Sequence, residues 1–365
     1  MTNKTGTSKE LTSVGVNENL VANAAYHSDS ANLDLLRSAA ILFVVAFHLA
    51  LFFGGQRLDA VLWPLGHWGV LMFFVHTSMV LMFSLERQAL RYPNSGLFLQ
   101  FMVRRWFRIA PLATFIVLTV VVLALPVGHL RNGQFEPVSL SFLGVLWNLL
   151  LVQNIMHTDS VIAPLWSLPY EMQMYLVLPT LFMFVRSQRS VVFMVTCWSA
   201  VVLLVSVWLR IDSHHLFDMP IYAPCFLSGV LAYRLTKLQR GSWPFFLWPI
   251  VITAITSIYM MHPSLIAGWV CCLLLGILLP QCRELPAGLI RNTCHLVARY
   301  SYGVYLSHFI CIWFAFVALA NENLAVRIAV FVVSTIAVPV ALYHFIELPM
   351  ITLGARLVRR PQTQV

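Results

Sequence analysis

Long apolar segments constrain the fold of this chain more than any other feature. Apolar residues make up 59% of its 365 residues and charged residues only 10%, whereas soluble domains carry about 25% charged residues. A helix needs about 20 mostly apolar residues to cross a bilayer. The sequence therefore predicts an all-α, polytopic membrane helix bundle.

Ten segments are long enough to cross, and one further run is doubtful. The ten lie near residues 33–53, 66–84, 109–127, 170–186, 191–209, 218–234, 243–261, 264–281, 302–319 and 325–345. The doubtful run, residues 140–154, is short. Whether it crosses decides the orientation of every later segment.

Lysine and arginine positions distinguish the two topologies, because these residues concentrate in short cytoplasmic loops. With ten spans and a cytoplasmic N-terminus, 18 of the 23 Lys and Arg lie inside and four outside, with Arg37 set aside in the first span. If residues 140–154 crossed, nine would lie inside and 13 outside. We therefore predict ten spans, cytoplasmic termini and a short non-crossing or re-entrant helix on the outer face.

The chain reads as one membrane domain, residues 33–350, between two tails. Residues 1–32 are polar and lack the basic, apolar and small-residue pattern of a cleavable signal. We predict a disordered cytoplasmic tail over 1–32, a retained first span, and a short basic cytoplasmic tail over 351–365.

Charge and cysteine patterns argue against other classes. The formal charge is +9, but the basic residues sit at the ends of apolar segments rather than in runs interleaved with aromatic residues, so membrane topology explains them better than nucleic-acid binding does. The seven cysteines form no Cys-x-x-Cys pair. We expect buried free thiols, without a disulfide framework or a metal site.

The first span carries ionisable groups where lipid is expected. In LDLLRSAAILFVVAFH (residues 33–48), each such group needs a partner, a cavity or a function. Eleven helical steps leave the side chains of Arg37 and His48 about 20° apart in azimuth and about 16 Å apart along the axis. Asp34 lies one turn before Arg37 and is expected to pair with it. A structural ion pair and a hydrogen-bonded core histidine explain these residues as well as a functional site does.

A cluster of arginines precedes the third span. FMVRRWFRIAPL (residues 101–112) contains Arg104, Arg105 and Arg108 at the cytoplasmic side. Arg105 and Arg108 are three residues apart, so on a helix they face the same way and could clamp a phosphate. Contact with lipid head groups is the simpler explanation, and a soluble phosphorylated donor is the functional one.

A second motif stands where the chain re-enters the membrane from outside, PLWSLPYE (residues 164–171). Ser167 is expected to cap the helix that follows, with Pro169 in its first turn and Glu171 at the positive end of its dipole. Trp166 beside a carboxylate also suits a bound sugar, because sugar rings stack on indoles and an acid can accept a hydroxyl proton. The two roles are compatible.

Two late motifs carry further polar groups. YSYGVYLSHF (residues 300–309) places Tyr302 and His308 in the inner half of the membrane, and HFIELP (residues 344–349) ends the last span. His344 and Glu347 are three residues apart and are expected to pair. For His76 and His344 a packing role is the preferred interpretation, because the sequence ties neither to a specific functional partner.

Taken together, the motifs resemble the acyltransferase-3 family of integral-membrane O-acyltransferases. The resemblance covers about residues 33–357 and rests on the order and spacing of LDLLRSAAILFVVAFH, WGVLMFF, RRWFRIAPL, WSLPYE, YSYGVYLSH and FIELP. Two glycines of the family pattern are missing: Asp-Gly-Leu-Arg is Asp34-Leu35-Leu36-Arg37 here, and Phe-Phe-x-x-Ser-Gly is FFVHTS (residues 73–78). Their loss puts helix packing or acceptor fit in doubt but removes no expected catalytic group.

The resemblance implies an enzyme of the bacterial cytoplasmic (inner) membrane that moves an acyl group, usually acetyl from acetyl-CoA, onto a carbohydrate. Acetyl-CoA is then a co-substrate, and no bound cofactor is expected. Residue by residue, the resemblance implies catalytic roles for His48, Arg37 and Glu171, and acyl-CoA binding by the arginine cluster. Roles in acceptor binding or motif structure fall to Asp34, Trp166, Ser167, Tyr302 and His308.

On this hypothesis acyl-CoA docks on the arginines, its thioester reaches past Arg37 toward His48, and the acceptor hydroxyl arrives near Trp166 and Glu171. His48 acts as general base or carries the acyl group itself. The rival is a transporter whose Arg and His residues line a substrate or proton path. The acceptor stays open among surface polysaccharide, lipopolysaccharide, periplasmic glucan, glycolipid and small metabolite, and the acyl group among acetyl, succinyl and longer chains.

Overall fold

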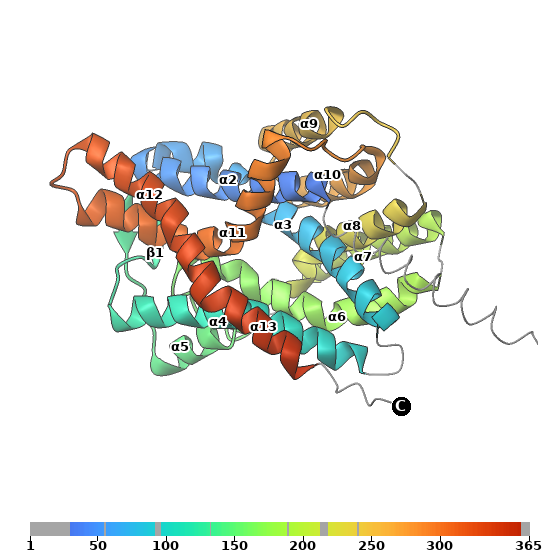
Figure 1. The fold of residues 1–365 in the computed structure, drawn as a ribbon, viewed down its shortest axis with the longest axis horizontal. Helices are drawn as coiled ribbons and strands as arrows, with labels where there is room; N and C mark the ends of the chain where they lie inside the picture. Colours follow the sequence, from blue (N-terminus) through green and yellow to red (C-terminus); the bar gives the residue numbers. More distant parts are fainter. Residues whose placement is uncertain are drawn as a thin grey trace, which may run out of the picture.

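The computed structural model describes residues 30–54, 56–91, 96–131, 133–187, 190–211, 218–238 and 241–358. The predicted N-terminal tail lies almost wholly outside these residues. The described part is almost entirely helical, as predicted (Figure 1). Its α-helices are α2 (Ala31–Gly54), α3 (Gln56–Arg91), α4 (Leu97–Val122), α5 (Phe142–Leu149), α6 (Leu168–Arg186), α7 (Val191–Ile211), α8 (Met219–Leu238), α9 (Leu247–Met261), α10 (Leu265–Leu278), α11 (Leu289–Trp313), α12 (Leu324–Leu342) and α13 (Leu348–Leu357).

Short elements join or extend these helices. Two are 3₁₀ turns, η1 (Ala163–Ser167) and η2 (Leu279–Gln281), and two are π-helical turns, η3 (Phe314–Ala318) and η4 (Tyr343–Glu347). Strand β1 (His129–Arg131) pairs antiparallel with β2 (Gln134–Glu136), with His129 opposite Glu136. Because α13 follows η4 directly, the first part of the predicted C-terminal tail is helical.

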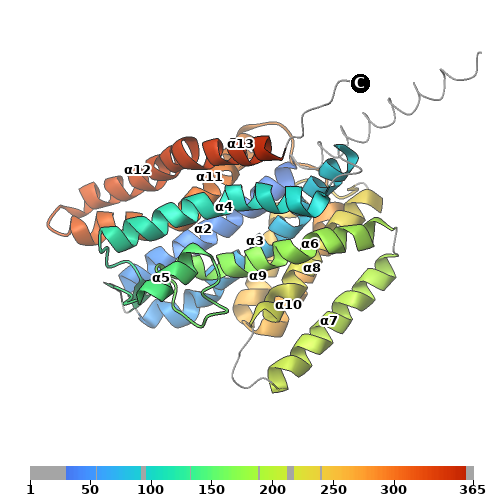
Figure 2. The same ribbon diagram turned by 90° about the horizontal axis from the view of Figure 1, so that it is seen from below.

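The chain is a multi-pass membrane protein by the length and hydropathy of its helices. Within the described residues, six segments are long and apolar enough to cross a bilayer: Ala31–Gly54, Val61–Leu90, Leu97–Val122, Val191–Ile211, Leu289–Ala318 and Leu324–Leu357. Helix α7 lies at the edge of the bundle (Figure 2) and packs on α8. It exposes Val192, Leu203 and Leu204, an apolar surface that suits lipid.

Two helices differ in extent from the predicted segments. Helix α4 begins at Leu97 rather than near residue 109, so the arginine cluster is part of the helix and not of a loop before it. The doubtful run forms only α5, whose eight residues span about 12 Å. That length is well short of the roughly 30 Å hydrocarbon core.

Helix α2 packs against both α3 and α11. Leu36, Ala40 and Val44 of α2 follow one another at one-turn spacing on one face and are almost fully buried, which is the pattern of a helix with one face in a core. Gly69 permits the close approach of α3, because a Cβ there would lie 2.6 Å from the Ala40 carbonyl oxygen. The ionisable residues of α2, Asp34, Arg37 and His48, are partly buried.

The beginning of α2 is fixed by an acidic side chain from the segment before α11. Glu284 accepts hydrogen bonds from the Asn32 backbone N–H at 3.0 Å and the Ser30 hydroxyl at 2.6 Å. A carboxylate at a helix N-terminus satisfies unpaired amides and complements the helix dipole. These bonds hold α2 in register with α11 near the residues that form the site.

Candidate active site

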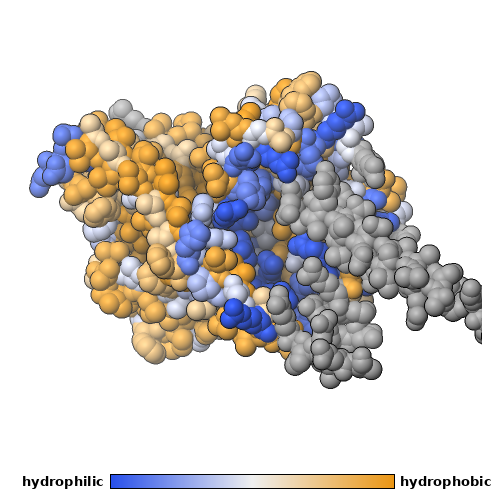
Figure 3. Space-filling view, in the orientation of Figure 1, coloured by the Kyte–Doolittle hydropathy of each residue, from blue (hydrophilic) through white to orange (hydrophobic). Residues whose placement is uncertain are grey.

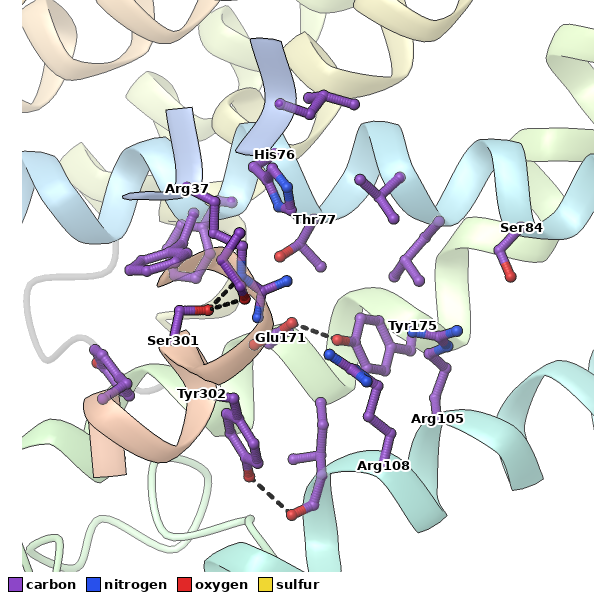
Figure 4. Close-up of a pocket in the computed structure, with 18 of the residues that line it drawn as sticks. Arg37, His76, Thr77, Ser84, Arg105, Arg108, Glu171, Tyr175, Ser301 and Tyr302 are labelled. Atoms are coloured by element: carbon purple, nitrogen blue, oxygen red, sulfur yellow. Dashed lines mark hydrogen bonds between the residues drawn. The ribbon is translucent and has the colours of Figure 1, made fainter. Parts of the chain in front are cut away.

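A cavity of about 630 Å³ is lined mainly by residues of α2, α3, α4, α6 and α11. Figure 3 shows hydrophilic residues gathered in a hollow between apolar surfaces, and Figure 4 shows its interior. Two carboxylates, Asp34 and Glu171, line it beside a larger number of arginines. The lining arginines are Arg37, Arg87, Arg104, Arg105, Arg108 and Arg299. We call this cavity the arginine pocket; its excess of positive charge suits an anionic ligand.

Arg37 joins α2 to α11 at the pocket wall. Its Nε donates to Ser301 Oγ at 2.5 Å, and the Ser301 hydroxyl in turn donates to the Ala298 carbonyl oxygen at 2.8 Å. Asp34 Oδ2 lies 2.9 Å from His295 Nδ1. The predicted Asp34–Arg37 pair is therefore not formed within the described residues, because α11 supplies each of these side chains with a different partner.

The cross-helix contacts show how α2 and α11 run. Asp34 meets His295, Arg37 meets Ser301, and His48 meets His308. The residue numbers of the partners increase in the same direction along both helices, so α2 and α11 are parallel neighbours. Arg37 and His48 therefore both face α11, in agreement with their predicted position on one side of α2.

The arginine cluster of α4 faces the pocket. Arg105 and Arg108 extend from α4 toward Glu171 and Tyr175 (Figure 4), and the Arg105 guanidinium lies 5.8 Å from the centre of the Phe101 ring. Tyr302 of α11 donates from its hydroxyl to the Ile109 carbonyl oxygen at 2.8 Å. This bond ties α11 to α4 beside the arginines.

The motif residues Ser167 and Glu171 also line the pocket. Glu171 accepts a hydrogen bond from the hydroxyl of Tyr175, one turn later on α6. The predicted cap at Ser167 is wrong: within the described residues its hydroxyl pairs with Tyr305 OH at 2.8 Å and makes no capping bond. The reason is that η1 runs directly into α6, so the backbone at Ser167 is already helical, with φ −83° and ψ −21°.

Trp166 is separated from the rest of its motif. It does not appear among the described residues that line the pocket. Its ring lies 5.7 Å from that of Tyr222 and 6.4 Å from that of His67, and the His67 ring stacks on Trp63 at 4.9 Å. Trp166 thus belongs to an aromatic cluster near the first turns of α6 and α8, while Glu171 belongs to the arginine pocket.

His48 and His308 form a contact of their own outside the pocket lining of the described residues. His308 Nε2 lies 3.1 Å from His48 Nδ1. His308 is fully buried and His48 is partly accessible. The nearest link to the pocket is Tyr305, which lines the pocket and whose ring centre lies 6.2 Å from that of His308.

Two other histidines differ in their surroundings. His76 is buried and lines the arginine pocket, and its Nδ1 has no hydrogen-bond partner among the described residues. His344 Nε2 lies 3.4 Å from Tyr300 OH. The predicted His344–Glu347 pair is wrong, since both Glu347 carboxylate oxygens lack a hydrogen-bond partner in the described part of the chain. Residues 343–347 form a π turn, whose wider spacing alters which side chains face each other.

Together, the fold and the pocket define an integral-membrane protein with a buried cationic site between its helices. Residues 30–344 match the family model described as an acyltransferase domain, and the chain belongs to this acyltransferase-3 family. It is therefore an integral-membrane acyltransferase. The family match supports the enzyme hypothesis over the transporter hypothesis. No curated protein and no solved structure matches the chain.

Most of the predicted site residues meet at one place, and some pocket residues escaped prediction. Asp34, Arg37, Ser167, Glu171, Tyr302 and the α4 arginines line one cavity. Tyr175 was missed, although its spacing of four residues from Glu171 on a helix was a usable signal. Ser301 and Tyr305 lie within a recognised motif, but their contacts depend on how α11 packs against α2 and η1.

Proposed function

We propose that this acyltransferase transfers an acyl group, normally acetyl, from acyl-CoA to a hydroxyl of a cell-surface or exported carbohydrate. The observation that carries the proposal is the arginine pocket, with six arginines against two carboxylates. Acyl-CoA presents several phosphates to a protein, and arginine binds phosphate oxygens with paired, charge-assisted hydrogen bonds. Arg104, Arg105 and Arg108 hold the nucleotide part of the donor on this proposal.

We further propose ten membrane crossings with both termini in the cytoplasm of a bacterial inner membrane. Each of the ten predicted segments overlaps a helix of the described structure. Helix α5 is too short to cross, which supports its assignment as a non-crossing helix on the outer face. In this topology the arginine pocket opens toward the cytoplasm, where acyl-CoA is made, and the aromatic cluster around Trp166 lies toward the outside.

His48 is the proposed catalytic group. As a general base, its imidazole takes the proton of the acceptor hydroxyl while the oxygen attacks the thioester carbonyl carbon. The carbon–sulfur bond then breaks, and the CoA thiolate leaves and takes up a proton. A covalent route through an acyl-histidine divides the same chemistry into two transfers.

The donor must reach from the pocket to His48 on this proposal. The pocket wall includes Tyr305, which contacts the ring of His308. We place the acyl end of the donor beside Tyr305 and the acceptor sugar beside the aromatic cluster, where Trp166 offers a face for stacking. Between the acyl end and the arginines that hold the nucleotide part, Arg37 and Glu171 orient the donor.

The test uses the purified full-length protein in lipid nanodiscs with labelled acetyl-CoA and a cell-envelope carbohydrate extract. We expect transfer of label by the wild type, loss of transfer in His48→Ala and Arg37→Ala, and full activity in the control His262→Ala, which alters an exposed histidine at the end of α9. NMR of surface glycans from a deletion strain should show missing O-acetyl signals. Full transfer by both site variants, or unchanged glycans, would overturn the proposal.

A further inference from the structure

The contact between His48 and His308 joins the first helix of the bundle to α11. Both rings also face carbonyl oxygens of their own helices. His48 Nδ1 lies 2.9 Å from the Val44 carbonyl oxygen. His308 Nδ1 lies 3.1 Å from the Val304 carbonyl oxygen and 2.7 Å from that of Tyr305. These neighbours restrict where each ring can carry its proton.

The carbonyl oxygens fix the proton of His308. A carbonyl oxygen only accepts hydrogen bonds, so the nitrogen that faces two of them must carry hydrogen. In neutral His308 the proton is therefore on Nδ1, and Nε2 has a lone pair. The opposite tautomer would set a lone pair against two carbonyl oxygens and forfeit a buried hydrogen bond, at a cost of about 1–3 kcal/mol.

The same reasoning then fixes His48. Its Nδ1 faces two acceptors, the Val44 carbonyl oxygen at 2.9 Å and the Nε2 lone pair of His308 at 3.1 Å. Both contacts require hydrogen on His48 Nδ1. In the neutral ring, the lone pair of His48 must then reside on Nε2, the nitrogen that points away from these partners.

The rings of His48 and His308 differ in how far they are buried. His308 is fully buried, whereas His48 keeps part of its surface accessible. The Phe309 ring meets His48 edge-on at 4.7 Å, and the Phe47 ring lies 4.8 Å from it. His48 is therefore the ring that can meet a ligand, and His308 is the ring behind it.

We propose that His308 is a positioning residue, which holds the proton of His48 on Nδ1 and thereby leaves the His48 Nε2 lone pair for the acceptor hydroxyl. This inference rests on the proposed catalytic role of His48. When Nε2 takes the hydroxyl proton, His48 becomes an imidazolium whose Nδ1–H still donates to His308 Nε2. His308 stays neutral throughout, and the proton on His48 leaves with the CoA thiol.

The test compares two substitutions of His308 in the full-length protein. In His308→Gln the amide oxygen can accept the Nδ1–H of His48, whereas His308→Leu offers no acceptor. Loss of a group that orients a metal-bound histidine typically costs about 10–100-fold in activity, and we expect the same range here. We expect kcat to fall by that factor in His308→Leu with KM for acyl-CoA unchanged, and to recover most of the wild-type value in His308→Gln.

A second measurement reads the tautomer directly. With ¹⁵N-labelled histidine, the His48 signals are assigned as those lost in His48→Ala. We expect hydrogen on Nδ1 in the wild type and in His308→Gln. In His308→Leu only the Val44 carbonyl oxygen of the two acceptors remains, so we expect a larger share of the tautomer with hydrogen on Nε2. This measurement needs only folded protein, so it does not depend on the substrate.

The outcomes separate this inference from the proposed function. If His48→Ala transfers normally, the proposed function fails, whatever His308 does. If His48→Ala is inactive but His308→Leu keeps wild-type kcat, or if the wild type shows hydrogen on His48 Nε2, the positioning role is overturned. Equal loss in His308→Leu and His308→Gln with an unchanged His48 tautomer would also overturn it.

Discussion

The Nε atom of Arg37 donates to Ser301 Oγ across 2.5 Å, which fixes a partly buried guanidinium between α2 and α11 at the wall of the arginine pocket. Ser301 is fully buried, so its hydroxyl is held in place by the surrounding protein. The direction of the Arg37 guanidinium therefore depends on a side chain 264 residues away in the chain.

Substitution of Ser301 by alanine should reduce acyl transfer by about tenfold. A hydrogen bond to a charged group contributes about 1.5–3 kcal/mol, and a change of about 1.4 kcal/mol in a barrier is tenfold in rate. Initial rates of labelled acetyl transfer measure the effect. Ser307→Ala is the matched control, because that buried serine on the same helix donates to the Gly303 carbonyl oxygen at 2.8 Å. Equal rates in the two variants would contradict this role for Ser301.

Arg105→Ala and Arg108→Ala should weaken donor binding. We expect KM for acyl-CoA to rise about tenfold for each variant, because a charged contact to phosphate is worth more than about 1 kcal/mol in a water-poor pocket. The control is Arg291→Ala, an exposed arginine at the beginning of α11 that lies outside the described pocket lining. A similar rise in KM for the control would point to general surface charge instead of the pocket.

Glu171→Gln should impair both activity and stability. The Glu171 carboxylate lies in the pocket with Arg37, Arg105 and Arg108, and loss of its charge leaves the positive charges of these arginines less balanced. We expect a lower melting temperature in detergent and at least tenfold slower transfer. Tyr175→Phe, which keeps the carboxylate, should have a smaller effect, and the exposed residue variant Glu322→Gln should match the wild type. If Tyr175→Phe were the more damaging change, the Tyr175 hydroxyl would contribute more to activity and stability than the Glu171 charge does, which would contradict this prediction.

His76→Phe should raise KM for acyl-CoA without lowering the melting temperature. The Nδ1 atom of His76 lacks a hydrogen-bond partner among the described residues, and a buried polar atom of this kind costs about 1–3 kcal/mol unless a ligand satisfies it. A bound donor in the pocket would recover part of that cost, which predicts a rise in KM of about tenfold. A higher melting temperature with unchanged KM would instead support the packing interpretation.

Gly229→Ala should destabilise the bundle. A Cβ at Gly229 would lie 2.0 Å from Ser78 Oγ and 2.2 Å from the Val75 carbonyl oxygen, so α8 and α3 would have to separate. We expect a loss of about 1–3 kcal/mol, measured as a lower melting temperature in detergent. Gly288→Ala is the control, since a Cβ there meets nothing within 4 Å. Recovery of stability in Gly229→Ala combined with Ser78→Gly would contradict the clash with the Val75 backbone.

The close approach of α8 to α3 at Gly229 explains how the bundle packs without one of the glycines of the family pattern. Ser78 stands where the family pattern has glycine, which left the packing of this helix in question. In the structure Gly229 of α8 provides the space, and the Ser78 hydroxyl donates within its own helix to Phe74 O at 2.9 Å. The missing glycine of α3 is thus accommodated by a glycine on the neighbouring helix, which a local motif cannot reveal.

Two side-chain pairs predicted from a spacing of three residues are not formed. Asp34 with Arg37, and His344 with Glu347, are neighbours three residues apart, and such pairs contribute only about 0.2–0.5 kcal/mol on a helix. A side chain that faces a packed neighbour can find its partner there, and α11 supplies His295 to Asp34 and Ser301 to Arg37. Local spacing therefore predicted which residues are functional candidates but not their partners.

The sequence by itself determined the membrane class, the all-α fold, the family and the common face of Arg37 and His48, because apolar length and helical period are local properties of the chain. Only the tertiary structure decided how the motifs combine. Packing of α2 against α11 separated the arginine pocket from the histidine pair, and the turn at η1 directed Ser167 to Tyr305 and Trp166 to the aromatic cluster. These contacts join residues on different elements, such as Ser167 and Tyr305, which are 138 positions apart in the chain. Their geometry follows from helix packing rather than from sequence spacing.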